Sequence, residues 1–311
     1  MAITLTQLNA FMAVVRCGSV TAAARELVVT QPSVSAAVGA LERELEVELT
    51  ERAGRTLRPT PAGHAFARYA ADVLGLLEQG ARAAREAAAA ERHSLRISAV
   101  TTAGEHLAPQ LIQAFGERHP ELELSLYVDN REQVFSHVAD RVADVAITGR
   151  IPGDGRFVGH AFAENPIVLI TAPDDPLARR RQVATAELGS RSWMVREPGS
   201  GTRALSEEYL STCGLEPNLL TLGSNGAIKQ AAQAGLGIAL QSRAAVELEL
   251  ELGLLATIDP RGGLPTRHWH VVRAATGPVR EEVEAFVRFC DSPTARLALE
   301  PRPGTRSRRA R

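Results

Sequence analysis

The chain has 311 residues and a formal net charge of −1, from 35 lysines and arginines against 36 aspartates and glutamates. Its length exceeds the roughly 150 residues that one hydrophobic core usually uses, so two or three domains are expected. The near-neutral charge excludes DNA binding through bulk basicity, so any DNA affinity must come from a local arrangement of positive side chains. The sequence shows neither a charged-then-apolar leader nor a long apolar run, so we expect a cytoplasmic protein that is not secreted and does not span a membrane.

Two short helices separated by a turn are predicted near the N-terminus. Ser19 is suited to cap the first helix, in which the small Ala23 and Ala24 let another helix pack closely. Thr30 is suited to cap the second helix, with Pro32 in its first turn, where a missing N–H has little cost. Upstream, apolar residues at helical spacing predict a third helix that completes the core: Leu8, Phe11, Met12 and Val15.

The second helix is amphipathic, with one buried stripe formed by Val34, Val38, Leu41 and Leu45. The opposite face carries short side chains near the N-terminus of the helix, which suits it to enter the DNA major groove, where Gln and Ser bond to base edges. The candidate DNA-binding residues of this helix are Gln31, Pro32, Ser33, Ser35 and Ala36.

A basic hairpin is predicted from Leu49 to Pro61. Arg52, Arg55 and Arg58 recur at every third position around Gly54, a spacing suited to a wing that grips phosphates or a narrow minor groove. The alternative is a set of solvated surface arginines on an ordinary helical subdomain. The order and spacing of the elements favour a winged helix-turn-helix.

These segments resemble the N-terminal block of LysR-type transcriptional regulators, and the resemblance spans nearly the whole chain. The matching motifs are Ala23-Ala24-Arg25-Glu26-Leu27, Thr30-Gln31-Pro32-Ser33-Val34-Ser35, Leu41-Glu42, Glu51-Arg52 and Thr60-Pro61-Ala62-Gly63. The resemblance implies that Gln31, Pro32, Ser35 and Ala36 lie at the groove and that Arg52 and Arg55 contact the backbone or minor groove. One departure is Thr50, which stands where the family usually has phenylalanine.

A long helix is predicted from Gly63 to about Glu91, with an apolar seam formed by Phe66, Tyr69, Val73 and Leu76 or Leu77. Because a lone amphipathic helix of this length must bury its seam, residues 63–92 are a candidate linker and dimerisation helix. The alternative is packing of the seam against its own head domain.

From Leu95 onward, short aliphatic runs alternate with helical ones, which indicates an α/β body with parallel strands. Helices are expected around 106–118, 131–141 and from Pro278 to Phe289. The predicted strands are Leu95–Val100, Leu122–Val128, Ala143–Thr148, Pro166–Ala172, Ser192–Arg196, Leu219–Leu222, Gly237–Leu240 and Arg267–Arg273.

By resemblance, this body is the two-lobed, periplasmic-binding-protein-like regulatory domain of the family. We expect a DNA-binding domain at 1–62, the linker helix at 63–92, an effector-binding domain at 93–295 and a disordered basic tail at 296–311. Lobe I is expected at about 93–165 and 266–295 and lobe II at about 166–265, with the chain crossing near Asn165 and Pro265.

Ligands of such sheets sit beyond the C-terminal ends of strands, where loops meet helix N-termini, and the loops at these positions are rich in hydrogen-bond donors. The candidate effector-binding residues are Thr101, Thr102, Asn130, Gly149, Arg150, Gly199, Ser200, Gly201, Thr202, Arg203, Ser224 and Asn225. Their convergence on one cleft predicts a small anionic effector. Each Gly-Ser run has the alternative of capping a helix without a ligand.

Several of these loops look like the subgroup that includes regulators of carbon-fixation genes. The matching runs begin at Glu197-Pro198-Gly199-Ser200, Gly223-Ser224-Asn225 and Asn130-Arg131-Glu132. Two departures are Asp129, where those relatives often carry glycine, and Gly226, where they often carry an acidic residue.

Catalytic and metal chemistry find little support in the sequence. The three cysteines, Cys17, Cys213 and Cys290, lack metal-ligand spacing, and only Cys213 with Cys290 offers an alternative as a redox pair. No phosphate-binding P-loop motif, nucleophile elbow or paired catalytic carboxylates accompany the Gly-Ser-Gly-Thr loop, so we expect neither an enzyme nor a cofactor.

The sequence therefore predicts a DNA-binding transcriptional regulator whose promoter binding responds to a small anionic metabolite. The alternative is a metabolite-binding protein without specific DNA recognition. The expected partners are double-stranded promoter DNA, the metabolite, a second copy through the linker helix, a homotetramer by resemblance, and RNA polymerase. No membrane partner is expected.

Overall fold

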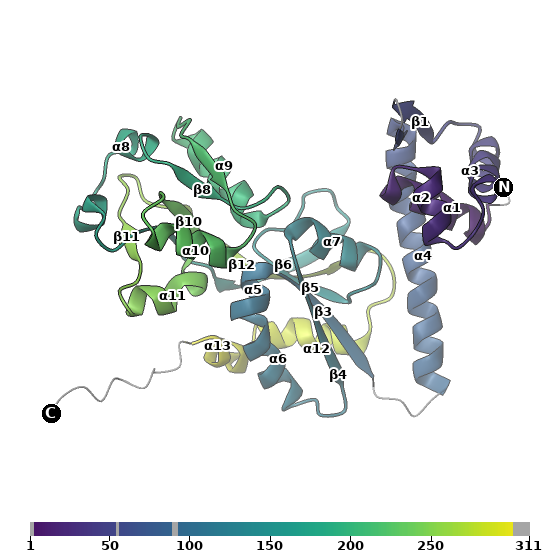
Figure 1. Cartoon of the computed structure of the whole chain (residues 1–311). Helices are drawn as coiled ribbons and strands as arrows, with labels where there is room; N and C mark the ends of the chain where they lie inside the picture. The colour runs from purple at the N-terminus through teal and green to yellow at the C-terminus, as the bar shows by residue number, and fades with distance from the viewer. Residues whose placement is uncertain (1–2, 54–55, 89–92, 301–311) are drawn as a thin grey trace. The chain divides into compact units, whose positions relative to one another are not determined.

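The computed structural model describes residues 3–53, 56–88 and 93–300. It divides into two compact units, one made largely of Met1–Glu91 and the other of Arg92–Val138 with Ala143–Arg311, which we call the head and the body. Figure 1 labels their elements, and each unit is described by itself. The prediction of a disordered tail at 296–311 was wrong for residues 296–299, which belong to helix α13 (Pro293–Leu299), because Ser292 caps this helix and Ala295 is buried. The rest of the predicted tail, from Pro301 onward, lies outside the described residues.

The head begins with the three predicted helices, α1 (Leu5–Cys17), α2 (Val20–Glu26) and α3 (Gln31–Leu45). Both predicted caps are confirmed, since the side chain of Ser19 accepts a hydrogen bond from the Ala22 N–H and that of Thr30 from the Ser33 N–H. A hairpin of β1 (Thr50–Ala53) and β2 (Thr56–Pro59) follows, and then the long helix α4 (Pro61–Ala88). This is a winged helix-turn-helix followed by a long helix.

The core of the head joins these elements through the apolar stripes that the sequence predicted. Phe11 of α1 and Leu41 of α3 are fully buried, together with Leu49 just before the hairpin. Val34 and Val38 are buried in the same cluster, and Leu45 is partly buried against it. The predicted stripe of α3 is therefore confirmed.

The apolar residues that were predicted to form one seam on α4 lie on two different faces of the helix. Phe66 packs against the core of the head, with Ala70 buried beside it. Tyr69, Val73 and Leu77 lie on another side of the helix and are 71%, 47% and 52% exposed. The prediction of one seam was wrong because spacings of three and four residues also describe two adjacent helical rows, and only packing distinguishes them.

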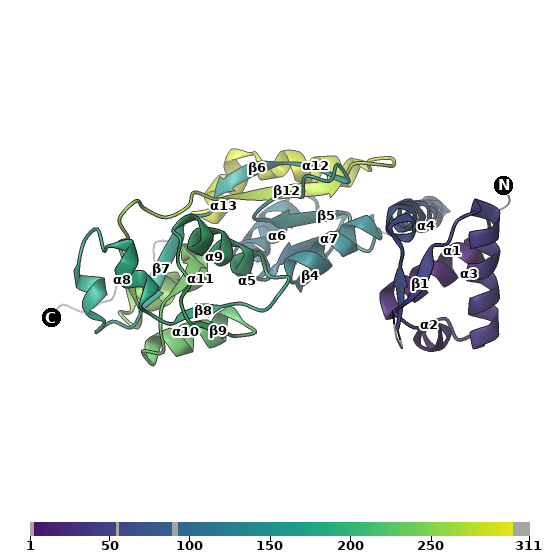
Figure 2. The ribbon, with the colours of Figure 1, turned by 90° about the horizontal axis from the view of Figure 1, so that it is seen from above.

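Lobe I of the body is built on a mixed five-stranded sheet, in the order β4-β3-β5-β12-β6. Its strands are β3 (Ser94–Val100), β4 (Glu123–Asp129), β5 (Val145–Thr148), β6 (Phe157–Glu164) and β12 (His268–Ala274). Its helices are α5 (Thr101–His106), α6 (Ala108–Gly116), α7 (Arg131–Ala139), α12 (Glu281–Cys290) and α13 (Pro293–Leu299). Figure 2 shows α12 beside the sheet that carries β12 and β6.

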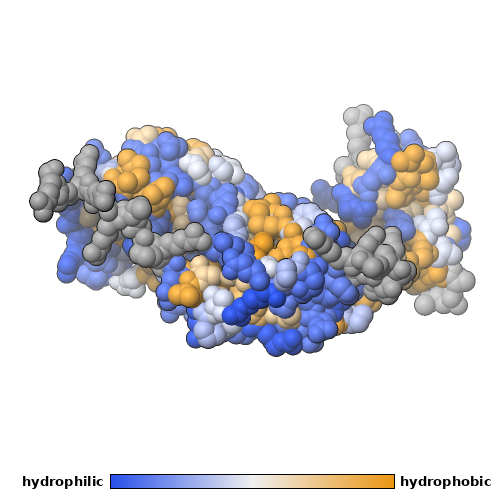
Figure 3. All heavy atoms as spheres, turned by 90° about the horizontal axis from the view of Figure 1, so that it is seen from below, coloured by the Kyte–Doolittle hydropathy of each residue, from blue (hydrophilic) through white to orange (hydrophobic). Residues whose placement is uncertain are grey.

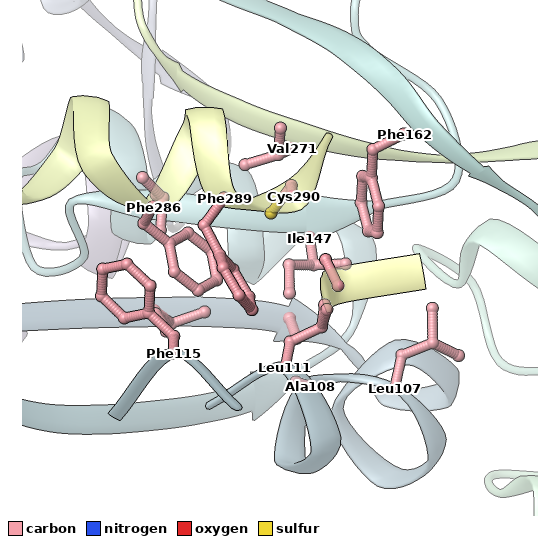
Figure 4. Close-up of a cluster of buried hydrophobic side chains, with 14 of the residues drawn as sticks. Leu107, Ala108, Leu111, Phe115, Ile147, Phe162, Val271, Phe286, Phe289 and Cys290 are labelled. Atoms are coloured by element: carbon pink, nitrogen blue, oxygen red, sulfur yellow. The ribbon is translucent and has the colours of Figure 1, made fainter. Parts of the chain in front are cut away.

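Aromatic side chains from α6 and α12 form the centre of the lobe I core (Figure 4). The Phe115 and Phe286 rings meet edge to face with centroids 5.1 Å apart, and Phe289 lies 5.2 Å from Phe115. Such contacts add to the stabilisation from burial. The predicted amphipathic C-terminal helix is thus confirmed, and it holds two segments distant in sequence together.

Lobe II contains the sheet β10-β7-β11 and the pair β8-β9. Its strands are β7 (Ile167–Thr171), β8 (Trp193–Val195), β9 (Leu219–Thr221), β10 (Ala239–Ser242) and β11 (Ala256–Ile258). Its helices are η1 (Pro176–Arg179), α8 (Thr185–Gly189), α9 (Gly201–Thr212), α10 (Asn225–Gln233) and α11 (Arg243–Glu251). An isolated parallel bridge between Trp193 and Ile238 links the two sheets.

The body differs from the prediction in strand direction and number. Only β3 with β4 and β5, and β8 with β9, run parallel, whereas β12 and β7 pair antiparallel with their neighbours. The chain leaves lobe I after β6 and returns with β12, so the returning strand enters its sheet in the opposite direction. Strands β6 and β11 were not predicted, since their polar and apolar residues alternate irregularly.

The two cysteines considered as a redox pair lie in different cores. Cys290 is buried in the core of lobe I, where burial raises the pKa of its thiol. Cys213 packs against the core of lobe II. A disulfide between them is therefore excluded by their placement in the body.

The face of the molecule shown in Figure 3 is mainly hydrophilic. On the face in Figure 3, hydrophobic side chains gather only in small patches between hydrophilic ones. Among the described residues, no helix is long and apolar enough to cross a membrane.

One residue of the helix-turn-helix has a strained backbone. Val28, in the turn between α2 and α3, has φ of 57° and is 89% exposed. A β-branched residue in the left-handed region is unfavourable because its Cβ approaches the following carbonyl oxygen. Asparagine tolerates this conformation better.

We predict that Val28→Asn stabilises the head by about 1 kcal/mol, the typical cost of a left-handed conformation for a residue other than glycine or asparagine. Denaturant unfolding followed by circular dichroism measures the effect. Val29→Asn is the matched control, since Val29 is also exposed but has no positive φ. Equal effects of the two substitutions would show that side-chain polarity, not backbone strain, is responsible.

Candidate functional site

The candidate DNA-binding face lies on α3 of the head. Gln31, Pro32, Ser33, Ser35 and Ala36 are all exposed, whereas Val34 between them is buried. The Ser33 hydroxyl lies 2.8 Å from the Thr30 hydroxyl, so it contributes to the helix cap. The remaining side chains present a small, uncharged surface at the N-terminus of α3, as a helix that reads the major groove requires.

The predicted basic hairpin is present as the antiparallel pair β1-β2. Arg52 and Arg58 are both exposed, and Arg58 lies opposite Glu51 across the hairpin. Arg55 lies outside the described residues. The hairpin therefore presents two described arginines to solvent, and one of them has a carboxylate as its cross-strand neighbour.

The base of the hairpin is fixed to α3 through Glu42, a residue that the sequence analysis did not single out. Oε1 of Glu42 accepts hydrogen bonds from the backbone N–H of Leu49 at 2.9 Å and of Thr50 at 3.0 Å. The Thr50 hydroxyl donates to the same oxygen at 3.0 Å. The hydroxyl that replaces the family's phenylalanine thus joins a polar network that holds β1 against α3.

The start of α4 is fixed to the same base of the hairpin, since Thr50 pairs with Pro59 there. The Thr60 hydroxyl donates to the Glu48 carbonyl oxygen at 2.8 Å and accepts from the Gly63 N–H at 3.0 Å. A Cβ on Gly63 would lie 1.9 Å from the Leu49 carbonyl oxygen, so only glycine lets α4 begin this close to β1. The base of the hairpin is therefore held from both strands, by Glu42 on the β1 side and by Thr60 on the β2 side.

The candidate effector site is a cavity of about 40 Å³ in the body, between residues of lobe I and lobe II. Lobe I contributes the ends of β3, β4 and β5 and the start of β12, while lobe II contributes the start of β7 and α9 and the ends of β8 and β10. The lining residues are Val100, Thr101, Thr102, Asn130, Arg131, Thr148, Gly149, Arg150, Asn165, Ile167, Arg196, Ser200, Gly201, Thr202, Leu205, Ser242, Arg267 and Trp269.

Helix α5 places Thr101 and Thr102 at the cavity because it packs very closely against β4. A Cβ on Gly104 would lie 2.6 Å from the Val128 side chain, so glycine is required at this contact. Thr101 donates its hydroxyl to the Asp129 carbonyl oxygen at 3.3 Å. Thr102 is buried and is one of the residues that line the cavity.

The cavity lining is positively charged, with Arg131, Arg150, Arg196 and Arg267 and no carboxylate among its residues. Arg196 is buried and paired with Glu197 at 2.7 Å, and the exposed Arg150 lies 3.3 Å from Glu208. Within the part of the chain that the structure describes, neither Arg131 nor Arg267 pairs with a carboxylate.

Burial lowers the pKa of Arg267 and of Arg131 below their usual range, and the neighbouring charge of Arg150 lowers each of them further. Arginine nevertheless remains charged in proteins. Arg267 donates to the Gly201 carbonyl oxygen at 3.3 Å, and Gly149 leaves room for it, since a Cβ there would lie 3.1 Å from Nη2. These two guanidinium groups are therefore suited to hold an anion.

The N-terminus of α9 adds hydrogen-bond donors to the cavity. Ser200 caps the helix by accepting from the Thr202 N–H at 3.2 Å, and Ser200, Gly201 and Thr202 all line the cavity. The first N–H groups of a helix have no partners within it and favour negative charge. Together with Arg131 and Arg267, they form a surface complementary to a small anion.

Polar residues also line the cavity where the chain passes between lobes. Asn165 and Ser242 are buried, and the Ser242 hydroxyl donates to the Asn165 side-chain oxygen at 2.7 Å. The Thr148 hydroxyl oxygen is fully buried without a hydrogen-bond partner among the described residues. A ligand that offers an oxygen or a hydroxyl would satisfy this group.

Four of the predicted effector residues do not line the cavity. Arg203 is directed to Glu207 at 2.7 Å and to the Arg196 carbonyl oxygen, and Ser224 caps α10. Gly199, with φ of 87°, lies in the loop before α9. Asn225 is buried behind Thr102, to which its amide donates at 3.1 Å.

Several lining residues were not among the predicted site residues: Arg131, Thr148, Asn165, Arg196, Ser242 and Arg267. Arg131 directly follows Asn130, so it could have been predicted from the rule that ligands bind beyond the C-terminal ends of strands, which we call the strand-end rule. Arg267 precedes its strand, so that rule does not apply to it. Among the described residues, no group of His, Cys, Asp and Glu is placed to hold a metal ion.

Comparison with known families matches both units. The model of the bacterial regulatory helix-turn-helix protein of the lysR family matches residues 5–64, and the LysR substrate binding domain matches residues 88–293. The chain belongs to the LysR family of transcriptional regulators. As a LysR regulator it binds DNA through its helix-turn-helix and a small-molecule effector through its body. LysR regulators are oligomeric proteins.

This LysR chain is similar to curated relatives that include regulators of carbon-fixation genes. The RuBisCO operon transcriptional regulator of Allochromatium vinosum is 35% identical, covering 96% of this chain and 98% of the relative. The transcriptional regulator CbbR of Rhodospirillum rubrum is 36% identical, covering 91% and 95%. Such relatives are transcriptional regulators and not enzymes, and their helix-turn-helix argues against a metabolite-binding protein without DNA recognition.

Solved structures agree with the fold. The regulatory domain of Synechocystis CcmR in complex with 2-PG is 29% identical, with a TM-score of 0.60, covering 64% of this chain and 96% of that one. A full-length OxyR variant from Pseudomonas aeruginosa has a TM-score of 0.62 and 21% identity, and the match covers 97% of this chain and 100% of that one. At this identity, the similarity supports the fold and nothing more.

We predict that Glu42→Ala lowers the free energy of unfolding of the head by about 1–3 kcal/mol, because two backbone donors and the Thr50 hydroxyl lose their acceptor. Loosening of the hairpin should also weaken DNA binding. Thermal unfolding and a gel-shift titration measure the two effects. Glu48→Ala is the control, since it removes the same charge from an exposed side chain, and an equal loss in that variant would assign the effect to charge alone.

Proposed function

We propose that this LysR regulator binds promoter DNA through α3 and the β1-β2 hairpin, and that a small metabolite anion in the cavity between the lobes modulates this binding. The observation that carries the proposal is the pair Arg131 and Arg267, which face the cavity without a carboxylate partner among the described residues. Both side chains are partly buried, and a partly buried charge without an ion-pair partner has a desolvation cost that an anionic ligand would reduce.

The class of ligand follows from the groups around the cavity. Two guanidinium groups suit the paired oxygens of a phosphate or carboxylate, and helix N-termini suit the same groups. The CcmR regulatory domain, which is similar to this body, was solved with 2-PG. We therefore infer that the effector is a small phosphorylated or carboxylated metabolite, and 2-PG is the first probe to use.

The size of the cavity supports a change in the lobes on binding. A volume of about 40 Å³ holds roughly three water molecules, given roughly 10–15 Å³ for one. We propose that the lobes move apart to admit a larger ligand and then close around it. Such a ligand shifts the equilibrium only if its affinity differs between the open and closed arrangements.

The proposed division of the chain assigns 1–62 to DNA binding, 63–92 to dimerisation and 93–295 to effector binding, with lobe I at about 93–165 and 266–295 and lobe II at about 166–265. Tyr69, Val73 and Leu77 support the dimer, because they form an exposed apolar row on α4. We further propose a homotetramer, contact with RNA polymerase and action in the cytoplasm, which is where bacterial promoters are transcribed.

The DNA-binding function is tested by footprinting on the DNA upstream of the chain's own gene, at controlled salt and with competitor. We predict a dyad-symmetric footprint and, for Arg52→Ala, a slope of log affinity against log salt that is smaller by about 1 per chain, since one phosphate contact is lost. Arg288→Ala is the control, as Arg288 is exposed on α12 of the body. An unchanged slope in Arg52→Ala would remove this residue from phosphate contact.

The effector function is tested by isothermal titration of the full chain with 2-PG and with inorganic phosphate. We predict that Arg267→Gln weakens binding of these anions by about tenfold or more, because a charge-assisted hydrogen bond is lost. Arg273→Gln is the matched control, since Arg273 lies on β12, the strand that Arg267 directly precedes, and does not line the cavity. Unchanged binding in Arg267→Gln, or no anion binding by the unmodified chain, would contradict the proposal.

A further inference from the structure

Behind the cavity, a chain of buried polar groups connects lobe II to Thr102 of lobe I. Arg196 donates from Nη1 to Oδ1 of Asn225 at 2.7 Å, and Nδ2 of Asn225 donates to the Thr102 hydroxyl oxygen at 3.1 Å. The three side chains are only 4%, 3% and 6% exposed. Of the three, Arg196 and Thr102 line the cavity and Asn225 does not.

The direction of every hydrogen bond in this chain is determined by chemistry. A guanidinium group has donors only, so the Asn225 atom that faces Arg196 must be the oxygen. The amide nitrogen of Asn225 therefore faces Thr102, and because this nitrogen is also only a donor, the Thr102 oxygen must accept. The hydroxyl proton of Thr102 is left to donate elsewhere.

Among the described residues, no other hydrogen bond of the Thr102 side chain competes for that proton. Thr102 is a lining residue of the cavity, and we infer that its free donor is available to a ligand there. Arg196 is itself held by Glu197, with bonds of 2.7 and 2.9 Å from Nε and Nη2, so the start of the chain is fixed.

We propose that Asn225 is a positioning residue that determines effector specificity, because it fixes Thr102 as a hydrogen-bond donor and so selects a ligand with an acceptor oxygen. The inference rests on the proposed anion site and adds to it the residue that orients one of its donors. Asn225 acts through Thr102 and touches no ligand itself. Polarisation along such a chain strengthens each bond in a buried environment.

The key experiment is Asn225→Asp, a substitution of nearly equal size. The introduced carboxylate still accepts from Arg196, but it also accepts from the Thr102 hydroxyl, which turns the proton away from the cavity. The oxygen lone pairs of Thr102 then face the ligand. We expect the affinity of the full chain for 2-PG, measured by isothermal titration, to fall roughly tenfold to hundredfold, as for the loss of a hydrogen bond to a charged group.

A double-mutant cycle with Thr102→Val separates orientation from charge. Removing the hydroxyl should weaken 2-PG binding to a similar extent, and Asn225→Asp should then have little further effect. Thr102→Ser, which keeps the hydroxyl, should retain the sensitivity to Asn225→Asp. Asn218→Asp is the matched control, because it adds the same charge at an exposed position of lobe II and should leave 2-PG binding unchanged.

Two outcomes would overturn the inference. The first is unchanged 2-PG binding in Asn225→Asp, and the second is an equal loss in the presence and absence of the Thr102 hydroxyl, which would assign the effect to the added charge. If Asn225→Asp fails to fold, Asn225→Ala replaces it, with an expected loss smaller than that of Thr102→Val. Binding of 2-PG by Asn225→Ala equal to that of the unmodified chain would then refute the proposal. Absence of binding by the unmodified chain to both 2-PG and phosphate would instead refute the anion site itself.

Discussion

Two half-buried guanidinium groups, which form no ion pair with a carboxylate among the described residues, give the junction of the two lobes its positive charge. Arg131 and Arg267 face one cavity, and burial lowers the pKa of both, which is a sign that their charged forms are incompletely solvated. The fold keeps them in place through local packing: Arg131 lies over the Phe135 ring, and Gly149 gives Arg267 its space. Local packing thus fixes the positive charge at the lobe junction. The hydrogen-bond donors of α9 and the hydroxyl groups of α5 are arranged around this charge.

The head was predictable nearly in full from the sequence because its determinants are local. Ser19 and Thr30 act as caps within one turn of their helices, and the stripe Val34, Val38 and Leu41 follows directly from the helical period. What the sequence did not provide is the contact between segments. Glu42 and Gly63 hold the base of the hairpin through atoms of Leu49 and its neighbours, and no periodic pattern marks such a contact.

In the body, the strand-end rule found part of the site and missed the rest for a geometric reason. Thr102 and Thr202 follow parallel strands or open a helix, as the rule requires. Arg267 precedes β12, but β12 runs antiparallel to β5, with His270 opposite Thr148. The beginning of β12 therefore lies at the same sheet edge as the end of β5. Without the pairing, the sequence offers no signal that Arg267 and Gly149 are neighbours.

The polar chain through Asn225 also bears on how a ligand changes the body. It joins α10 of lobe II to α5 of lobe I inside a buried region, where an unsatisfied amide or hydroxyl is costly. Separation of the lobes would break the hydrogen bond between Asn225 and Thr102. The arrangement in which the two lobes are joined is therefore favoured as long as water does not take the place of either hydrogen-bonding side chain. A ligand that accepts from Thr102 adds to the same closed state. If Thr102 donates to the ligand as proposed, recognition and lobe closure depend on one set of hydrogen bonds, and this would give the ligand the difference in affinity that a shift in equilibrium requires.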